Sequence, residues 1–169
     1  FLVTVILGVL LGGRLGYVLF YDPMHFMAHP FEIFAVWKGG MASHGGFIGV
    51  TIALIVWTKR NSIDLWKIAD VLVVPVAIGL AFGRIGNFIN QELYGTVTSL
   101  PWGMHFPGAE GIRHPVQLYA ALKDIILASL LYLHLVRTSA LRGTYASGIT
   151  ASLFLIGYGF LRSFVEILR

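Results

Sequence analysis

The chain has 169 residues, of which 57% are hydrophobic and only 12% are charged, with a formal net charge of +4. A soluble domain carries about 25% charged residues, so this composition excludes a water-soluble domain and indicates a helical membrane protein. The absence of cysteine excludes disulfides, thiolate metal sites and a cysteine nucleophile supplied by this chain. The basic residues fit membrane topology better than nucleic-acid binding, so no nucleic-acid partner is expected.

Five segments are long and apolar enough to be transmembrane helices, since a span needs about 20 mainly apolar residues. In chain order they cover about residues 1–21, 42–58, 68–90, 116–136 and 146–167. We therefore expect an all-α fold, a polytopic transmembrane helix bundle that forms a single domain over residues 1–169. Because the chain starts inside an apolar run at Phe1 and ends without a polar tail at Arg169, we expect it to be truncated at both ends.

Basic residues in the short connections predict how the helices are oriented. Lys59, Arg60 and Lys67 follow the second predicted span, and Arg137 and Arg142 follow the fourth. These two connections lie on the same side of the membrane, and their positive charge predicts that this side is cytoplasmic. The two longer loops, residues 22–41 and 91–115, are then expected on the outer side.

Glycines at four-residue spacing indicate places where helix backbones approach one another closely in lipid. Three predicted spans carry such stripes, formed by Gly8, Gly12 and Gly16, by Gly45 and Gly49, and by Gly79 and Gly83. Helix packing alone accounts for most of these glycines.

Polar side chains near the ends of the predicted spans form the candidate functional site, because an ionisable group in hydrocarbon is costly and usually faces the bundle interior. The predicted topology places all of them at one depth, in the outer half of the membrane. In chain order they are Arg14, His44, Arg84, Asn87, Asn90, Glu92, His114, Gln117, Tyr119, Arg162 and Glu166.

Several of these residues also have a structural interpretation. Arg14 could extend its side chain to the membrane surface. His44 stands beside glycines and could bond to backbone where its helix starts. Asn90 could cap the end of the third helix. Arg162 and Glu166 are four residues apart and could form a simple ion pair on one helix face.

The chemistry of the polar set favours a phosphate-containing lipid as substrate. Arginine binds phosphate oxygens through two parallel hydrogen bonds, and an imidazole transfers protons near neutral pH. Arg84 and Asn87, three residues apart on one helix face, are the residues least readily explained by structure alone. We therefore expect a phospholipid that enters from the outer leaflet. A metal site is not expected, because the histidines lack ligand spacing and the arginines would repel a cation.

A small membrane transporter of an anionic solute is the alternative function, since paired arginines within a membrane could bind an anion in transit. Such a pathway should continue towards the cytoplasmic side. The inner halves of the predicted spans are instead mainly apolar, which argues against a transporter.

The segment Gly83–Gly95, with the sequence GRIGNFINQELYG, resembles the signature of the bacterial prolipoprotein diacylglyceryl transferases. Further segments resemble the same family in the same order, namely Gly13–Tyr17 with Tyr21, Gly40–Gly46, His114–Tyr119 and Leu161–Glu166. The resemblance covers essentially the whole chain. It departs from the family at Gln91, where the family usually has glycine, and in the brief loop between Leu93 and His114.

The resemblance implies an enzyme of lipoprotein biosynthesis with seven spans, of which this chain carries about five. It implies a catalytic domain in the bacterial inner membrane with its active site towards the periplasm. The implied reaction moves the diacylglyceryl group of phosphatidylglycerol onto the lipobox cysteine in the signal peptide of a preprolipoprotein. A thioether forms and glycerol phosphate leaves. The reacting thiol belongs to the substrate, and neither a metal nor a soluble cofactor is implied.

For this reaction we expect Arg84 and Arg162 to hold the phosphate and stabilise the departing glycerol phosphate, with His44 as the base that accepts the thiol proton. The expected catalytic residues are therefore His44, Arg84 and Arg162. The expected substrate-binding residues are Arg14, Tyr17, Tyr21, Arg84, Asn87, Asn90, Glu92, Gly95, His114, Gln117, Tyr119 and Glu166. Among them, the two glutamates are expected to orient the arginines, and the first two tyrosines to shape the lipid pocket.

Overall fold

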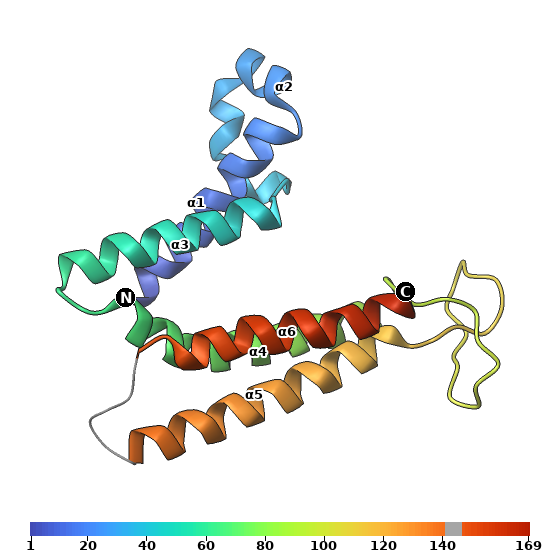
Figure 1. The fold of residues 1–169 in the computed structure, drawn as a ribbon. Helices are drawn as coiled ribbons and strands as arrows, with labels where there is room; N and C mark the ends of the chain where they lie inside the picture. The colour runs from blue at the N-terminus through green and yellow to red at the C-terminus, as the bar shows by residue number, and fades with distance from the viewer. Residues whose placement is uncertain (141–146) are drawn as a thin grey trace. The chain divides into compact units, whose positions relative to one another are not determined.

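The computed structural model describes residues 1–140 and 147–169, and the regular elements within these ranges are helices (Figure 1). They are α1 (Leu2–Phe20), α2 (Pro23–Ala28), η1 (Pro30–Phe34), η2 (Val36–Lys38), α3 (Ser43–Arg60), α4 (Leu65–Ile89), α5 (Val116–Ala140) and α6 (Ile149–Ile167). The all-α prediction is confirmed. The chain forms two compact units, an N-terminal unit of residues Phe1–Leu65 and a C-terminal unit of residues Trp66–Arg169.

The five long helices agree with the five predicted spans to within a few residues at most ends. Four of the described helices, α1, α4, α5 and α6, are long and apolar enough to cross a membrane. Helix α3 has 18 residues, but polar Ser43 and His44 begin it and Lys59 and Arg60 end it, so its apolar stretch is shorter. Arg142, one of the residues used to predict orientation, lies outside the described residues.

Glycines bring α1 and α3 into close backbone contact in the N-terminal unit. A Cβ atom added to Gly16 would lie 2.8 Å from the Cα of Gly45, and one added to Gly8 would lie 2.7 Å from the Cβ of Ala53. An alanine at either position would therefore push the two helices apart. The expectation that these two stripes mark close helix contacts is confirmed, and the structure shows that they contact each other.

The glycine stripe on α4 is different. Apart from adjacent residues and the backbone of α4 itself, no atom in the described part of the chain lies within 4 Å of a Cβ atom added to Gly79 or Gly83. The expectation that these two glycines mark a close helix contact is therefore wrong for the described residues. Spacing alone could not distinguish the stripes on α1 and α3, which are in close contact, from the stripe on α4, which is not. The space around a glycine depends on the neighbouring helix and not on the glycine's own sequence.

In the C-terminal unit α4, α5 and α6 pack around an apolar core. Val74 of α4 and Leu127 and Leu131 of α5 are buried there, and Phe154 and Tyr158 of α6 pack against them. Leu127 and Leu131 are four residues apart on α5, as are Phe154 and Tyr158 on α6, so this part of the core follows from the apolar periodicity.

Asp70 of α4 closes the start of α6 at one end of this core. The backbone N–H groups of Gly148 and Ala151 donate to its two carboxylate oxygens over 2.7 and 2.8 Å. The first N–H groups of a helix have no partner within the helix, and a negative charge is favourable at that end. Asp70 is 1% exposed, so it supplies these contacts away from water.

Candidate functional site

The end of α4, the start of α5 and the end of α6 meet at one end of the C-terminal unit, where backbone hydrogen bonds hold them together. The N–H of Gly95 donates to the carbonyl of His114 over 2.9 Å, and the N–H of Thr96 donates to the carbonyl of Leu168 over 3.0 Å. The segment that follows α4 is thereby fixed to both neighbouring helices. The residues of the family signature lie at this junction.

Gly95 allows this close arrangement because it has no side chain. A Cβ atom added there would lie 2.5 Å from the carbonyl oxygen of Leu168 and 2.6 Å from a methyl carbon of Val116. Real Cβ atoms do not approach backbone atoms so closely, so any other residue would force the helix ends apart. The geometry gives Gly95 a packing role at the junction.

Three polar side chains form a chain of hydrogen bonds beside the junction. The amide nitrogen of Asn87 donates to the Glu92 carboxylate over 2.8 Å, and the amide nitrogen of Gln117 donates to the Glu92 backbone carbonyl over 2.7 Å. Gln117 is fully buried, and its amide oxygen has no hydrogen-bond partner among the described residues. This oxygen is an unused acceptor inside the polar end of the unit.

Arg84 lies on α4 three residues before Asn87 and is partly buried. Within the described part of the chain, no hydrogen bond or ion pair involves its guanidinium group. Arg162 instead forms an ion pair with Glu166, as the structural interpretation of these two residues predicted. Glu166 also lies 3.5 Å from Arg169. The donors of Arg84, near the end of α4, are therefore free to bind an anion.

His114 and Tyr119 tie the 91–115 loop to the first turns of α5. The Tyr119 hydroxyl accepts a hydrogen bond from Trp102 Nε1 over 2.8 Å and lies 3.3 Å from His114 Nδ1. His114 is buried. Both side chains are occupied by these contacts, so the geometry assigns them to positioning the loop.

Asn90 and Gln91 end α4 through a Schellman motif. The N–H of Glu92 donates to the carbonyl of Asn87 over 3.0 Å, and the N–H of Gln91 donates to the carbonyl of Phe88 over 3.0 Å. In this motif the residue after the cap adopts a left-handed conformation, which is usually left to glycine. Gln91 has a φ of 56°. The glycine that the family usually carries here therefore has a conformational cause, and the exposed Asn90 side chain plays no part in the cap.

Replacing Gln91 with glycine is expected to raise the free energy of unfolding by about 1 kcal/mol, because a left-handed conformation costs an L-residue about that much. Thermal or denaturant unfolding of the protein in detergent measures the change. Gln91→Ala is the matched control, since it removes the same side chain and keeps the strain. A glycine variant no more stable than the alanine variant would contradict this explanation.

In the N-terminal unit, Arg14 fixes the 22–41 loop to α1. It is 5% exposed and donates to four loop carbonyls: Glu32 at 2.5 Å, Ile33 at 2.8 Å, Gly39 at 2.6 Å and Gly40 at 3.0 Å. The alternative in which Arg14 extends to the membrane surface is therefore wrong. Its donors are taken up by the loop, so the geometry makes it a positioning residue.

The loop that Arg14 holds is itself stabilised by ion pairs around Glu32. Its carboxylate lies 2.8 Å from Lys38 Nζ and 3.1 Å from His25 Nε2. The hydrogen bonds from Lys38 and then His25 lower the pKa of Glu32 from 4.5 to about 2. The loop therefore keeps this negative charge throughout the physiological pH range.

Tyr17, Tyr21 and His44 are the remaining site residues predicted in the N-terminal unit. The Tyr17 and Tyr21 rings stack with their centroids 5.3 Å apart, and Gly40 lies against the Tyr17 ring. His44 is exposed in the first turn of α3. No hydrogen bond joins its side chain to the described residues, so its ring is available to an incoming group.

Sequence reasoning left three buried charged residues out of the candidate set. Asp70 closes α6, as described above. Lys123 and Asp124 lie within α5, 8% and 1% exposed, and form an ion pair, while Lys123 Nζ lies 4.2 Å from the centre of the Tyr158 ring. Two adjacent charges inside an apolar span were the available signal, because such charges are costly in a membrane unless they are paired.

The apolar helices define a multi-pass membrane protein. The polar groups at the junction where α4 ends, α5 begins and α6 ends form a candidate site for an anionic substrate. Residues 1–169 match the family model described as prolipoprotein diacylglyceryl transferase, and the chain belongs to this family. The resemblance that the sequence suggested is thereby confirmed.

Curated bacterial relatives with the name phosphatidylglycerol–prolipoprotein diacylglyceryl transferase agree with this assignment. The protein of Nitrosomonas europaea is 46% identical over 166 residues, which cover 97% of this chain and 58% of the relative. That of Cereibacter sphaeroides (strain ATCC 17025) is 49% identical over 179 aligned residues, 99% of this chain and 60% of the relative. The protein of Rhizobium meliloti is 46% identical over 164 residues, which cover 96% of this chain and 58% of the relative. The chain thus spans about three-fifths of the length of these relatives.

Proposed function

We propose that the protein transfers the diacylglyceryl group of phosphatidylglycerol to the cysteine thiol of a preprolipoprotein. The observation that carries the proposal is Arg84, a partly buried arginine in the family signature with no ion-pair partner among the described residues. An arginine held near a polar helix junction with its donors free is suited to a phosphate group. The names of the relatives supply the two substrates.

In this proposed function, residues 1–169 act as one catalytic domain in the bacterial inner membrane, with its active site towards the periplasm. The lipid donor enters from the outer leaflet. The acceptor is the lipobox cysteine in the signal peptide of the preprolipoprotein. No metal or other cofactor takes part in the proposed reaction.

In the proposed reaction the thiolate sulfur attacks the glycerol carbon that carries the phosphate ester. A carbon–sulfur bond forms, the carbon–oxygen bond to phosphate breaks, and glycerol phosphate leaves with the electron pair. Arg84 binds the phosphate and stabilises the negative charge that develops on it. Arg162, oriented by its ion pair with Glu166, supports the same charge through its remaining donors.

The other site residues act through the arrangement of the junction. Glu92 accepts the Asn87 amide and so directs it to the face of α4 near Arg84. Gln117, which is fully buried, fixes the backbone of Glu92 through its amide nitrogen. Asn90, with an exposed side chain, is the further amide donor to the substrate. In the N-terminal unit, the stacked rings of Tyr17 and Tyr21 are the proposed aromatic contact for the lipid.

His44 is proposed as the base that accepts the thiol proton. Replacing it with glutamine, which keeps a polar side chain of similar size but cannot take up a proton, should lower the rate by about 100-fold or more near neutral pH. Initial rates at several pH values measure the loss. The glutamine variant should recover as the pH rises above the thiol pKa of about 8.5, because the thiolate then forms without a base.

A rate near that of the wild type at neutral pH would exclude the base role for His44. His105→Gln is the matched control, since that histidine is exposed in the 91–115 loop and has no assigned role.

The proposed activity is tested with purified protein in phosphatidylglycerol vesicles and a synthetic lipobox peptide. A gain in the peptide's mass equal to one diacylglyceryl group is expected, and a peptide with serine in place of the cysteine should gain nothing. The same vesicles, loaded with an anionic solute, test the transporter alternative. Solute flux without a change in the peptide would overturn the transferase proposal.

A further inference from the structure

A pair of buried charges, Lys123 and Asp124, lies within α5 and has no part in the reaction proposed above. The two side chains form an ion pair and are 8% and 1% exposed. Val116 begins α5 at the junction with α4 and α6, so Lys123 lies seven residues, or about 10 Å, along the helix from that junction. The pair is therefore inside the apolar part of the span, where an ionisable group is costly.

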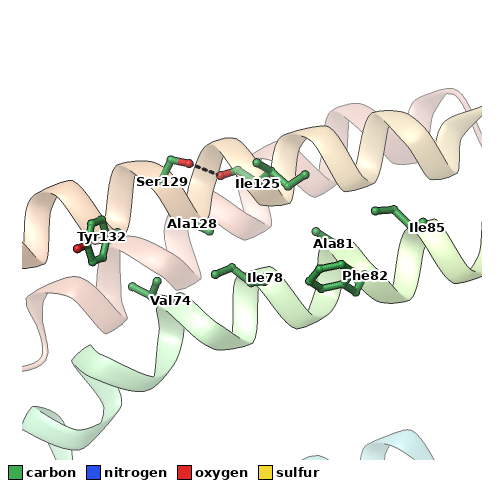
Figure 2. Close-up of a pocket in the computed structure, with 9 residues that line it drawn as sticks. All are labelled: Val74, Ile78, Ala81, Phe82, Ile85, Ile125, Ala128, Ser129 and Tyr132. Atoms are coloured by element: carbon green, nitrogen blue, oxygen red, sulfur yellow. Dashed lines mark hydrogen bonds between the residues drawn. The ribbon is translucent and has the colours of Figure 1, made fainter.

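Helix α5 presents different sides to its two neighbours. Figure 2 shows Ala128 and Ser129 on the side that faces α4 across an apolar groove. Lys123, Leu127 and Leu131 recur every four residues on another side, and the two leucines belong to the core against which α6 packs. Residues four apart are neighbours on a helix surface, so Lys123 continues this stripe towards the junction.

Helix α6 carries a matching stripe. Phe154, Tyr158 and Arg162 are likewise four residues apart, and the rings of the first two stack with their centroids 5.7 Å apart. Because α5 begins at the junction and α6 ends there, the two helices are antiparallel. The Nζ atom of Lys123 lies 4.2 Å from the centre of the Tyr158 ring, one helical turn before Arg162. A cation over the face of an aromatic ring is a favourable contact with a defined geometry.

Stability alone does not account for the Lys123–Asp124 pair. Replacing a buried ion pair with apolar side chains of similar volume is often neutral or stabilising, because the burial of two charges costs much of what their attraction returns. Apolar cores also lose their unique packing before they lose their stability. What a buried polar contact adds is a fixed register between the helices that it joins.

The orientation of Arg162 depends on how α6 faces α5. Its ion pair with Glu166 lies within α6, so this contact moves with the helix and does not fix the side that α6 presents. The contact between Lys123 and Tyr158 joins the two helices one turn away. A rotation of α6 that carried Arg162 away from the junction would also carry Tyr158 away from Lys123.

We propose that Lys123, held in place by Asp124, is a positioning residue that directs Arg162 towards the phosphate of the donor lipid. It acts through Tyr158, which it contacts, and does not touch the substrate. This inference rests on the proposed function and extends it, because it assigns a part in the reaction to two charges that lie outside the junction.

The test replaces both charges together, because a single replacement would leave the other buried charge without its partner. The double variant Lys123→Met, Asp124→Leu keeps side chains of similar size, and its thermal unfolding temperature in detergent should equal or exceed that of the wild type. Its kcat for transfer from phosphatidylglycerol to a lipobox peptide should fall about tenfold or more, since a small misplacement of a group that acts on the reacting atoms has an effect of that size. The KM for phosphatidylglycerol should change by less than about twofold, because Arg84 still binds the phosphate.

Lys123→Arg keeps a cation that reaches both Asp124 and the Tyr158 ring, so its kcat should stay within about threefold of the wild type. Lys67→Met is the matched control, because Lys67 is exposed near the start of α4 and the change removes a lysine from the surface. It should change neither kcat nor KM.

A double-mutant cycle with Arg162→Lys tests whether the buried pair acts through Arg162. Lysine carries a single flexible charge and does not depend on the orientation of a planar fork. In the Arg162→Lys protein, the same replacement of Lys123 and Asp124 should therefore lower kcat by no more than about threefold.

The outcomes separate this inference from a role in folding and from the proposed function. A double variant with the kcat of the wild type would overturn the inference. A double variant that loses thermal stability together with kcat would assign the pair to folding alone and overturn it as well. An equal loss of kcat with and without Arg162→Lys would show that the pair does not act through Arg162. A wild-type protein that transfers no lipid would instead contradict the proposed function on which the inference rests.

Discussion

Replacing Arg84 with lysine is expected to lower the rate of diacylglyceryl transfer by about 100-fold or more while the protein remains folded. Lysine keeps the positive charge but loses the planar pair of donors that binds two phosphate oxygens at once. Arg84 makes no ion pair with a described residue, so the substitution breaks no contact of the kind that holds Arg14 or Arg162. The loss should therefore appear in catalysis and not in stability.

Steady-state kinetics in detergent with phosphatidylglycerol and a lipobox peptide measure this effect, and thermal unfolding of the same samples checks the fold. Arg137→Lys is the matched control, because Arg137 lies in the last turn of α5, away from the junction. Undiminished turnover by Arg84→Lys would rule out binding of the phosphate through two parallel hydrogen bonds.

Replacing Asp70 with alanine is expected to lower the free energy of unfolding by about 3 kcal/mol, because a hydrogen bond to a buried charged group contributes about 1.5–3 kcal/mol. Two such bonds, from the N–H groups of Gly148 and Ala151, lose their acceptor at the start of α6. Asp70→Asn keeps one oxygen acceptor and should lose about half as much. Denaturant unfolding in detergent measures the three proteins side by side.

Glu110→Gln controls for the change in net charge, since Glu110 is exposed in the 91–115 loop. An alanine variant at position 70 with the stability of the wild type would show that α6 does not depend on this carboxylate.

The helices could be predicted from the sequence because each span carries its own signal. Apolar length determines where a helix crosses a membrane, and the observed bounds of α1, α4, α5 and α6 follow the predicted spans closely. The contact between Arg162 and Glu166 was also predictable, since residues four apart on a helix always face each other. Contacts within one helix are determined by local sequence.

Contacts between distant segments could not be predicted in this way. Arg14 is held by backbone carbonyls of a loop, and every residue has a carbonyl, so the sequence does not mark these partners. The capping role of Asp70 depends on where α6 begins in space, 78 residues further along the chain. The same limit applies to Gly95, whose packing role depends on Leu168 at the far end of α6.

At Gln91, the departure from the family pattern is explained only when the sequence and the structure are considered together. The sequence showed that a usual glycine is missing, and the structure shows that the position is left-handed and ends α4. The substitution is therefore explained as local strain next to Glu92, in a segment where Leu93 is also left-handed, with a φ of 57°. Non-glycine residues in this conformation cluster at functional sites.

The most direct test of the account follows the peptide's mass and the release of glycerol phosphate together, in wild-type protein beside Arg84→Ala. The protein is reconstituted with phosphatidylglycerol and a lipobox peptide. The wild type should release one glycerol phosphate for each diacylglyceryl group that the peptide gains, and the variant should yield neither product. A folded wild-type protein that yields no mass gain, or a variant that yields both products at the wild-type rate, would contradict it.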